Sequence, residues 1–256
     1  MTLAIPFGLA IGLAVGMLGG GGSVLAVPVL VYVLGESLPD ATTASLLVVG
    51  AGSLAGAAGH ALAGRVCWRH AVSFTVAAIP GIAAGTLAGD AVPAELLLAV
   101  FALVMLVAAR TTWTRADDEP DPGPAADLCP PLRLPRDALA GVAVGFVTGF
   151  LGIGGGFLIV PTLAVGLAFT MRTAVGTSLA IITATSAIGL AAHLLAGRAI
   201  DVPETAAMAL ACMAGSLAGA RLAGHVPQRT LSRAFAALVV TVAGFLLVSA
   251  LALGGP

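Results

Sequence analysis

Charge is scarce in this sequence, and lysine is missing altogether, so that all eleven basic residues are arginines. Charged residues make up 9% of the 256 residues and hydrophobic residues 59%, whereas a soluble domain carries about 25% charged residues. The net charge of −1 offers no basic surface for a nucleic acid. The apolar runs are continuous rather than alternating, which argues against a β-barrel. The composition therefore predicts an all-α, polytopic integral membrane protein that is embedded in a lipid bilayer.

Cysteine and the common enzyme motifs are also in short supply. The three cysteines are odd in number and scattered, without the spacing of a metal site. We therefore expect no disulfide framework, no metal and no other cofactor, and we interpret Cys67 and Cys212 as small apolar residues. The sequence has no GxSxG, no HExxH and no ATP-binding loop. These absences predict that the protein is not an enzyme and draws its energy from a gradient or a partner.

Acidic residues are missing from the middle of the apolar segments. They stand at the segment ends, as Glu36, Asp40, Asp90, Glu95, Asp201 and Glu204. An ionisable residue deep in a membrane segment usually marks a cation or proton pathway. Its absence here favours an anion over a cation as the substrate.

Glycine, by contrast, is concentrated in two clusters that match each other. Residues 16–23 (GMLGGGGS) precede VLAVP, and residues 149–156 (GFLGIGGG) precede FLIVP. A glycine inside a helix costs about 0.8–1 kcal/mol relative to alanine, so each cluster is expected to break its helix. Inside a bilayer, a break is tolerated only where the backbone meets protein, water or a ligand. Paired breaks in two halves of a chain are the best sequence indicator of a transporter's binding site.

The chain divides into two membrane repeats, at residues 1–113 and 137–256, joined by a linker at residues 114–136. The linker holds an acidic run and six prolines, a composition that favours an extended, solvated segment. A shift of 133 positions aligns Gly19 with Gly152, Pro28 with Pro161, and His60 with His193. Each repeat is expected to hold four apolar segments long enough to cross a membrane. They lie near residues 2–34, 41–63, 71–89 and 94–112, and near 137–169, 173–195, 203–224 and 228–252.

The arginines predict how the segments are oriented, because positive residues favour the cytoplasmic side. If all eight segments span, the arginines divide seven to four. If each glycine-broken segment instead returns to its starting side, ten arginines share the linker's side and only Arg198 opposes them. The second model leaves three full spans in each repeat, which makes the repeats inverted. We therefore favour inverted repeats in the cell membrane, with a cytoplasmic linker.

Candidate binding groups cluster around the two breaks. Half-helices that begin near Ser23 and Gly156 would point backbone N–H groups and a positive dipole end at an anion. An alternative is that the glycines only allow tight helix packing, which explains regularly spaced glycines such as Gly52, Gly56, Gly81 and Gly85 better than it explains the clusters. The binding residues that we predict are Gly21, Gly22, Ser23, Gly154, Gly155, Gly156, Ser45, Thr177 and Ser178.

The hydroxyl and imidazole groups have simpler alternatives as well. A serine or threonine hydroxyl in a helix often bonds the preceding backbone carbonyl instead of a ligand. His60 and His193 form the only symmetric titratable pair within the apolar segments, and we consider them as carriers of a coupling proton. Either histidine could instead bond a backbone carbonyl near the interface. We interpret Arg65 and Arg198 as interfacial anchors.

At these residues the sequence resembles the sulfite exporter TauE/SafE family of membrane transporters (DUF81 type). The blocks at residues 19–28 (GGGGSVLAVP) and 152–161 (GIGGGFLIVP) carry the resemblance, together with residues 174–179 (AVGTSL) and the element from His193 to Gly197. Residues 41–46 (ATTASL) depart from the pattern in the first half. The resemblance implies transport, usually outward, of a small sulfur-containing anion or organic acid such as sulfite, a sulfonate or sulfoacetate.

The sequence therefore predicts a secondary transporter of a small anion that works by alternating access around the two breaks. The coupling ion would be a proton or sodium, and a homodimer is compatible with this interpretation. Two alternatives stay open: a passive anion channel, and a membrane assembly factor without transport activity.

Overall fold

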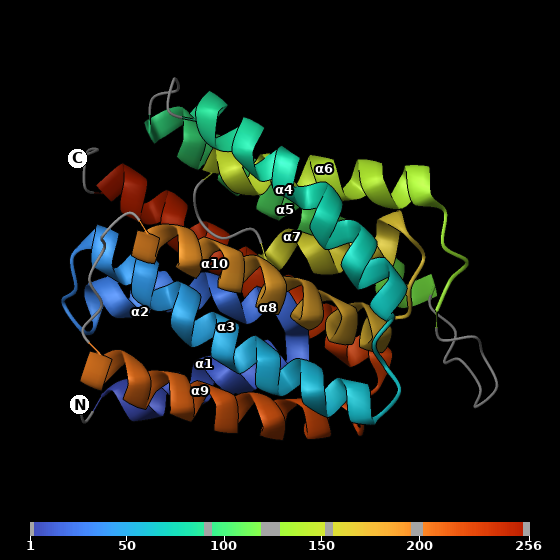
Figure 1. Cartoon of the computed structure of the whole chain (residues 1–256), viewed down its shortest axis with the longest axis horizontal. Coiled ribbons are helices and arrows are strands. Elements are labelled where there is room, and N and C mark those ends of the chain that lie inside the picture. The colour runs from blue at the N-terminus through green and yellow to red at the C-terminus, as the bar shows by residue number, and fades with distance from the viewer. Residues whose placement is uncertain (1–2, 90–93, 119–128, 152–155, 196–201, 253–256) are drawn as a thin grey trace.

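The computed structural model describes residues 3–89, 94–118, 129–151, 156–195 and 202–252, and these residues form helices and turns without a strand (Figure 1). The all-helical prediction is thereby confirmed. The first half comprises α1 (Ala4–Leu18), the 3₁₀ turn η1 (Gly19–Leu25), α2 (Ala26–Tyr32), α3 (Leu38–Leu62), α4 (Trp68–Gly89) and α5 (Ala94–Asp118). The second half comprises α6 (Leu134–Leu151), α7 (Gly156–Pro161), the π-helical turn η2 (Thr162–Gly166), α8 (Met171–Leu195), α9 (Val202–Ala223) and α10 (Gln228–Ala252).

Within the described residues, four helices are long and apolar enough to cross a membrane by length and composition. They cover Asp40–Leu62, Trp68–Ala88, Met171–Leu195 and Pro203–Ala223. Local signals set the ends of the first of these: the Ser37 side chain accepts a hydrogen bond from the Asp40 N–H at 3.4 Å and caps α3. Beyond the other end, Gly64 adopts φ +70°, a left-handed conformation that suits glycine and turns the chain toward α4.

Both glycine-broken segments return to the end of the molecule from which they start. In the first, Gly22 lies against the backbone of Ala14 and Val15, so the chain reverses after α1. In the second, Arg136 at the start of α6 donates a hydrogen bond to the carbonyl of Gly166 at the end of η2. This is the geometry that the re-entrant model requires.

Four connections meet at one end of the molecule, which we call the linker end. It comprises the α3–α4 turn, the start of α6, the start of α8 and the α9–α10 turn, as Figure 1 shows. A disulfide joins Cys67 to Cys129 there, and the Arg172 guanidinium donates to the Val226 carbonyl at 2.9 Å. The described arginines outside α5 lie at or near this end, and Arg198 lies outside the described residues.

Helices from the two halves interlock through glycine. Gly12 and Gly16 of α1 lie directly on the backbone of α9, and Gly145 and Gly149 of α6 lie on the backbone of α4. These four glycines occupy equivalent positions under the 133-residue shift, and the helices that they touch are also equivalent. The contacts that each half makes with the other are therefore reciprocal, while the inverted orientation of the repeats stays a prediction.

The regularly spaced glycines elsewhere have the packing role that the sequence suggests. An added Cβ at Gly81 or Gly85 would overlap the backbone of α6, and one at Gly52 or Gly56 would collide with side chains of α9. Small residues let neighbouring membrane helices approach closely and gain van der Waals contact. These glycines therefore fix the scaffold that surrounds the two breaks.

Candidate functional site at the glycine crossing

The two glycine breaks meet inside the molecule, between α1 and α8. An added Cβ at Gly20 of η1 would overlap the carbonyl of Gly156, which begins α7. Gly19 has φ +69°, and an added Cβ there would lie 2.6 Å from Ser178 Oγ and 3.0 Å from Val160 Cγ2. Only glycine allows two backbones to approach this closely.

Two serines from opposite halves flank this contact. An added Cβ on Gly156 would lie 2.9 Å from Ser23 Oγ, and Ser178 is fully buried beside Gly19. We call the group Gly19, Gly20, Ser23, Gly156 and Ser178 the glycine crossing. The sequence assigned Ser23, Gly156 and Ser178 to the binding site, and the structure brings these three together.

Both serine hydroxyls point at backbone carbonyls in this structure. Ser23 Oγ donates to the Gly20 carbonyl at 2.6 Å, and Ser178 Oγ donates to the Val175 carbonyl at 2.8 Å. This is the local bond that hydroxyls in helices commonly make. A serine hydroxyl rotates to suit its partner, so either can turn toward an anion at the crossing.

The other predicted binding residues lie in varied places. Ser45 Oγ donates to the Thr42 carbonyl at 2.8 Å. Thr177 Oγ1 accepts a hydrogen bond from the Cys67 N–H at 3.1 Å, so it anchors the α3–α4 turn on α8. Gly21 and Gly22 lie within η1.

Gly154 and Gly155, the remaining predicted binding residues, lie outside the described residues. The first break forms a 3₁₀ turn over residues 19–25, and α2 begins at Ala26 rather than near Ser23, where the sequence predicted the start of a half-helix. A 3₁₀ turn pairs backbone groups three residues apart, which satisfies part of the backbone that the break releases.

The two histidines of the symmetric pair have different surroundings. His60 is fully buried, and its Nε2 lies 3.0 Å from the carbonyl of Gly16. Gly16 belongs to the last turn of α1, where carbonyls lack partners within the helix, so His60 Nε2 donates to one of them. His60 Nδ1 is buried without a hydrogen-bond partner among the described residues. His193 is half-buried at the far end of α8, with Nδ1 2.9 Å from Thr43 Oγ1.

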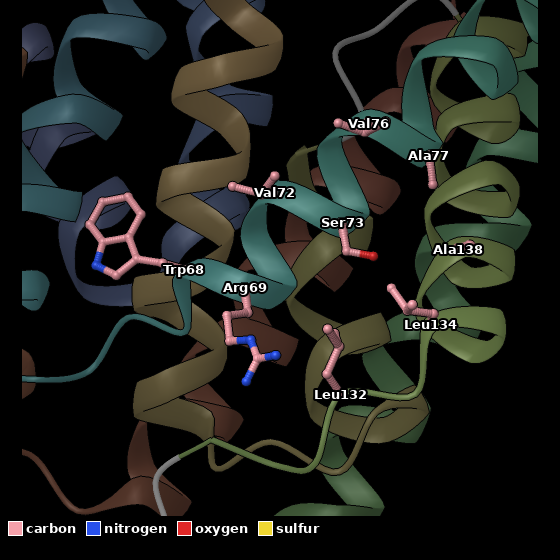
Figure 2. Close-up of a pocket in the computed structure, with 9 residues that line it drawn as sticks. All are labelled: Trp68, Arg69, Val72, Ser73, Val76, Ala77, Leu132, Leu134 and Ala138. Carbon is pink, nitrogen blue, oxygen red and sulfur yellow. The ribbon is translucent and has the colours of Figure 1, made fainter.

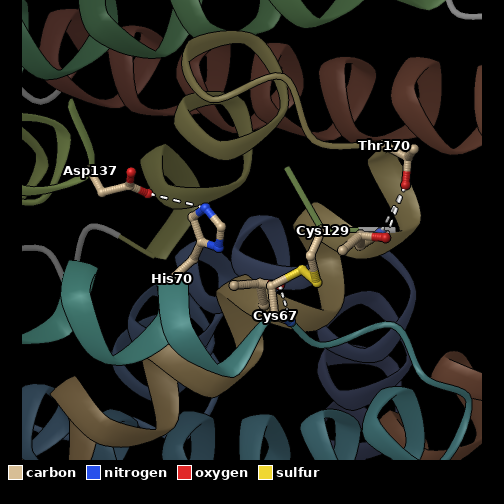
Figure 3. Close-up of a disulfide and its surroundings, with 7 residues drawn as sticks. Cys67, His70, Cys129, Asp137 and Thr170 are labelled. Carbon is tan, nitrogen blue, oxygen red and sulfur yellow. Dashed lines mark hydrogen bonds and ion pairs between the residues drawn. A yellow bond between two sulfur atoms is a disulfide. The ribbon is translucent and has the colours of Figure 1, made fainter. Parts of the chain in front are cut away.

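The absence of a disulfide was a wrong prediction, because Cys67 and Cys129 are bonded at a Cα–Cα distance of 5.7 Å (Figure 3). The odd number of cysteines concealed a pair that is 62 residues apart in the sequence. Cys67 is buried and Cys129 is exposed, while Cys212 is a buried free thiol. The predicted topology could have indicated that Cys67 and Cys129 meet, because the α3–α4 turn and the linker fall on the same side of the membrane in both arginine models.

Two hollows among the described residues are lined by side chains outside the glycine crossing. A groove of about 710 Å³ runs between α4 and the start of α6 (Figure 2). Its lining is mainly apolar and includes Val72, Val76 and Leu134, with Arg69 and Ser73 as its polar members. Such a lining does not compensate the desolvation of a small anion. A cavity of about 160 Å³ at the linker end is lined by His70 and Asp137, among others.

His70 and Asp137 form a buried pair between α4 and α6, with His70 Nε2 3.5 Å from Asp137 Oδ1 (Figure 3). Asp137 also accepts a hydrogen bond from the Arg133 N–H at 3.1 Å, which caps the start of α6. This pair therefore joins two helices from different halves. Within the described ranges, no group of three histidine, cysteine or acidic side chains is arranged to hold a metal ion.

Residues 4–246 match the model of a family described as sulfite exporter TauE/SafE. A probable membrane transporter protein of Xylella fastidiosa (strain 9a5c) is 33% identical, over 95% of this chain and 93% of its own length. Similar proteins described as probable membrane transporters include MJ0441 of Methanocaldococcus jannaschii (28% identical, 76% of this chain and 74% of its own) and YunE of Bacillus subtilis (24%, 89% of each). No solved structure matches the chain significantly.

Proposed function

We propose that this chain, which belongs to the sulfite exporter TauE/SafE family of membrane transporters, is a secondary transporter that exports a small anion across the cell membrane. The substrate that we propose is a sulfur oxyanion such as sulfite, in agreement with the description of the family, or an organosulfonate such as sulfoacetate. The glycine crossing is the observation that carries the proposal, because two helix breaks from opposite halves meet there in the interior.

The residues of the crossing favour an anion. Its side-chain groups are the hydroxyls of Ser23 and Ser178, and its glycines place no side chain between the two backbones, which lie directly against each other. No acidic residue belongs to it, and the acidic residues of the sequence stand at segment ends or in the linker. Backbone N–H groups and hydroxyls can bind an anion without a basic side chain, which avoids placing an unpaired arginine in the membrane interior.

The arrangement of the halves supports alternating access as the mechanism that we propose. The crossing lies where η1 of the first half contacts α7 of the second, so a shift of one half against the other changes both sides of the site. Energy would come from an ion gradient. His60 bonds the last turn of α1 next to the crossing, and it is the better placed of the two histidines to carry a coupling proton.

Flux into proteoliposomes tests the proposal. We expect the purified protein to carry sulfite or sulfoacetate with saturating kinetics, and Ser178→Ala to lower the maximal rate because one donor at the crossing is lost. Ser73→Ala serves as the matched control, since Ser73 lines the apolar groove on α4. Non-saturating, uncoupled flux would indicate a channel. No flux of any anion, with the protein folded, would favour an assembly factor.

A further inference from the structure

Two arginines converge on one turn at the linker end. Arg172, in the first turn of α8, donates from Nη2 to the Val226 carbonyl at 2.9 Å. Arg65, in the α3–α4 turn, lies over Gly224, where an added Cβ would be 3.0 Å from Arg65 Nη2 and 3.2 Å from Nη1. Because Gly224 and Val226 are two residues apart in the α9–α10 turn, both guanidinium groups meet at the same place.

Neither guanidinium has a carboxylate partner among the residues that the structure describes. Both arginines are half-buried, and Arg172 Nε is buried without a hydrogen-bond acceptor in the described ranges. Burial lowers the pKa of the Arg65 guanidinium, and the positive charge of Arg172 lowers it further. Like charges that are held together without a counterion destabilise the protein, and an anion between them removes this cost.

A third arginine lies nearby. Arg221, in the last turn of α9, and His225, in the α9–α10 turn, are exposed, with His225 Nδ1 3.1 Å from the Arg221 carbonyl. Gln228 Oε1 is already engaged, since it accepts a hydrogen bond from the Met171 N–H at 2.9 Å. The α9–α10 turn and its surroundings therefore present hydrogen-bond donors and arginine charge that have no acidic partner within the described part of the chain.

The position of the pair connects it to the glycine crossing. The Arg65 carbonyl lies on α8 at Gly176, and the neighbouring Thr177 accepts a hydrogen bond from Cys67. These contacts hold the Arg65 turn against α8. Arg172 and Ser178 are six residues apart on that helix, which corresponds to about 9 Å along its axis.

We propose that Arg65 and Arg172 form a binding site for a small divalent oxyanion at the linker-end mouth of the transport pathway. The forked guanidinium group matches two oxygens of such an anion, which a lysine ammonium does not. The inference rests on the proposed function, since it assigns the first contact of the same substrate before the glycine crossing. It changes the role of Arg65 from an interfacial anchor to a substrate ligand.

Binding of sodium sulfate and sodium sulfite to the delipidated protein in detergent tests the site. Calorimetry at constant ionic strength measures the affinity, with sodium acetate as the monovalent comparison. We expect Arg65→Gln and Arg172→Gln each to weaken divalent-anion binding by at least about tenfold, because each removes charge-assisted hydrogen bonds. Arg69→Gln is the matched control, since Arg69 is exposed on the apolar groove, and it should bind as the wild type does.

The lysine variants keep the measurement interpretable if a glutamine variant does not fold. Arg65→Lys and Arg172→Lys preserve the charge and lose the fork, so we expect intermediate affinities. Wild-type affinity in all four variants would overturn the proposal. So would a wild-type protein that binds sulfate and acetate equally well.

A lipid phosphodiester also offers anionic oxygens to guanidinium groups, although it carries one negative charge rather than two, and a second set of measurements distinguishes it from a free anion. Nanodiscs with phosphatidylglycerol are compared with nanodiscs of phosphatidylcholine alone, and retained lipid is measured after detergent extraction. Loss of phosphatidylglycerol retention in the glutamine variants, without a change in sulfate affinity, would overturn the assignment to a free anion. Sulfate binding that depends on both arginines, without flux in proteoliposomes, would keep this site and reject the proposed transport. Flux in proteoliposomes without arginine-dependent sulfate binding would support the proposed transport and reject the arginine site.

Discussion

His60 and His193 occupy equivalent positions in the two halves, and the residues that face them are equivalent as well. His60 faces Gly176, where an added Cβ would lie 3.0 Å from the histidine Cβ, and His193 Nδ1 lies 2.9 Å from Thr43 Oγ1. Thr43 and Gly176 are related by the same 133-residue shift. One sequence difference, glycine against threonine, therefore separates two contacts that the repeat would otherwise make alike.

The difference shows what a glycine at position 176 allows at the linker end. Without a side chain at Gly176, the Arg65 carbonyl and the whole α3–α4 turn rest directly on α8. At the equivalent place in the first half, Thr43 carries a hydroxyl that lies 2.9 Å from His193 Nδ1. A transporter with inverted repeats changes its open side when the halves exchange such arrangements, so the comparison can be tested residue by residue.

The largest effect should come from the disulfide, which tethers the tight turn and has no counterpart in the second half, where Ile200 stands in the place of Cys67. Cys129→Ser should lower the stability by about 2–4 kcal/mol, the usual contribution of a disulfide that closes a long loop. Thermal unfolding in detergent checks this value, with Cys212→Ser as the control for loss of a thiol. Equal melting temperatures for wild type and Cys129→Ser would contradict it.

The disulfide also bears on orientation. Disulfides persist in oxidising compartments, whereas the arginines predict a cytoplasmic linker end. We expect the linker end to be cytoplasmic, so that thiol labelling in quenched cells finds Cys67 and Cys129 reduced and the bond forms when membranes are prepared in air. A completed disulfide in cells, together with a linker tag that impermeant reagents reach from outside, would reverse the orientation.

A side chain at Gly176 should have the next largest effect. Gly176→Ala places a Cβ against the Arg65 carbonyl, a backbone atom that cannot move away cheaply, and we expect a loss of about 3 kcal/mol, at the upper end of overpacking costs. Gly189→Ala on the same helix is the matched control, because its nearest neighbour would lie at an ordinary 3.4 Å. Chemical unfolding of the two variants gives the comparison, and similar stabilities would show that the turn is not pressed on α8.

Replacing each histidine in turn should reveal a further difference in stability between the two equivalent sites. His60→Ala leaves the buried Gly16 carbonyl without its donor, at a cost of about 2 kcal/mol, and should also lower transport if His60 carries the coupling proton. His193→Ala, at a half-buried position, should cost clearly less. Thermal unfolding and flux, measured on both variants, test the ranking. Equal losses of stability would mean that the two sites are equivalent after all.

The smallest effect is expected at Thr43. Thr43→Val removes the hydroxyl next to His193 with little change of shape, so we expect a loss of about 1 kcal/mol or less, while Thr43→Ser should keep most of the contact. The melting temperatures of the Thr43→Val and Thr43→Ser variants in detergent test this difference. A larger loss in Thr43→Ser than in Thr43→Val would contradict a role for the hydroxyl.

The sequence predicted the helical fold and the meeting place of the two breaks because glycine clusters and long apolar runs are strong local signals. It also named the carbonyl bond of His60 as an alternative to a proton carrier. The Cys67–Cys129 bond, the contact between Thr177 and Cys67, and the convergence of Arg65 with Arg172 were not predicted. Each depends on how the turns and the linker meet at one end, and periodicity within a segment carries no information on that.

Locating a bound anion tests the central claim most directly. Selenite is an oxyanion with a heavier central atom than sulfite, and its anomalous signal in crystals of the protein would mark its position. We predict a peak at the glycine crossing, between Ser23 and Ser178, which disappears in crystals of the Ser23→Ala, Ser178→Ala double variant. Selenite bound elsewhere in the molecule, with the crossing empty in a protein that transports the anion, would contradict the claim.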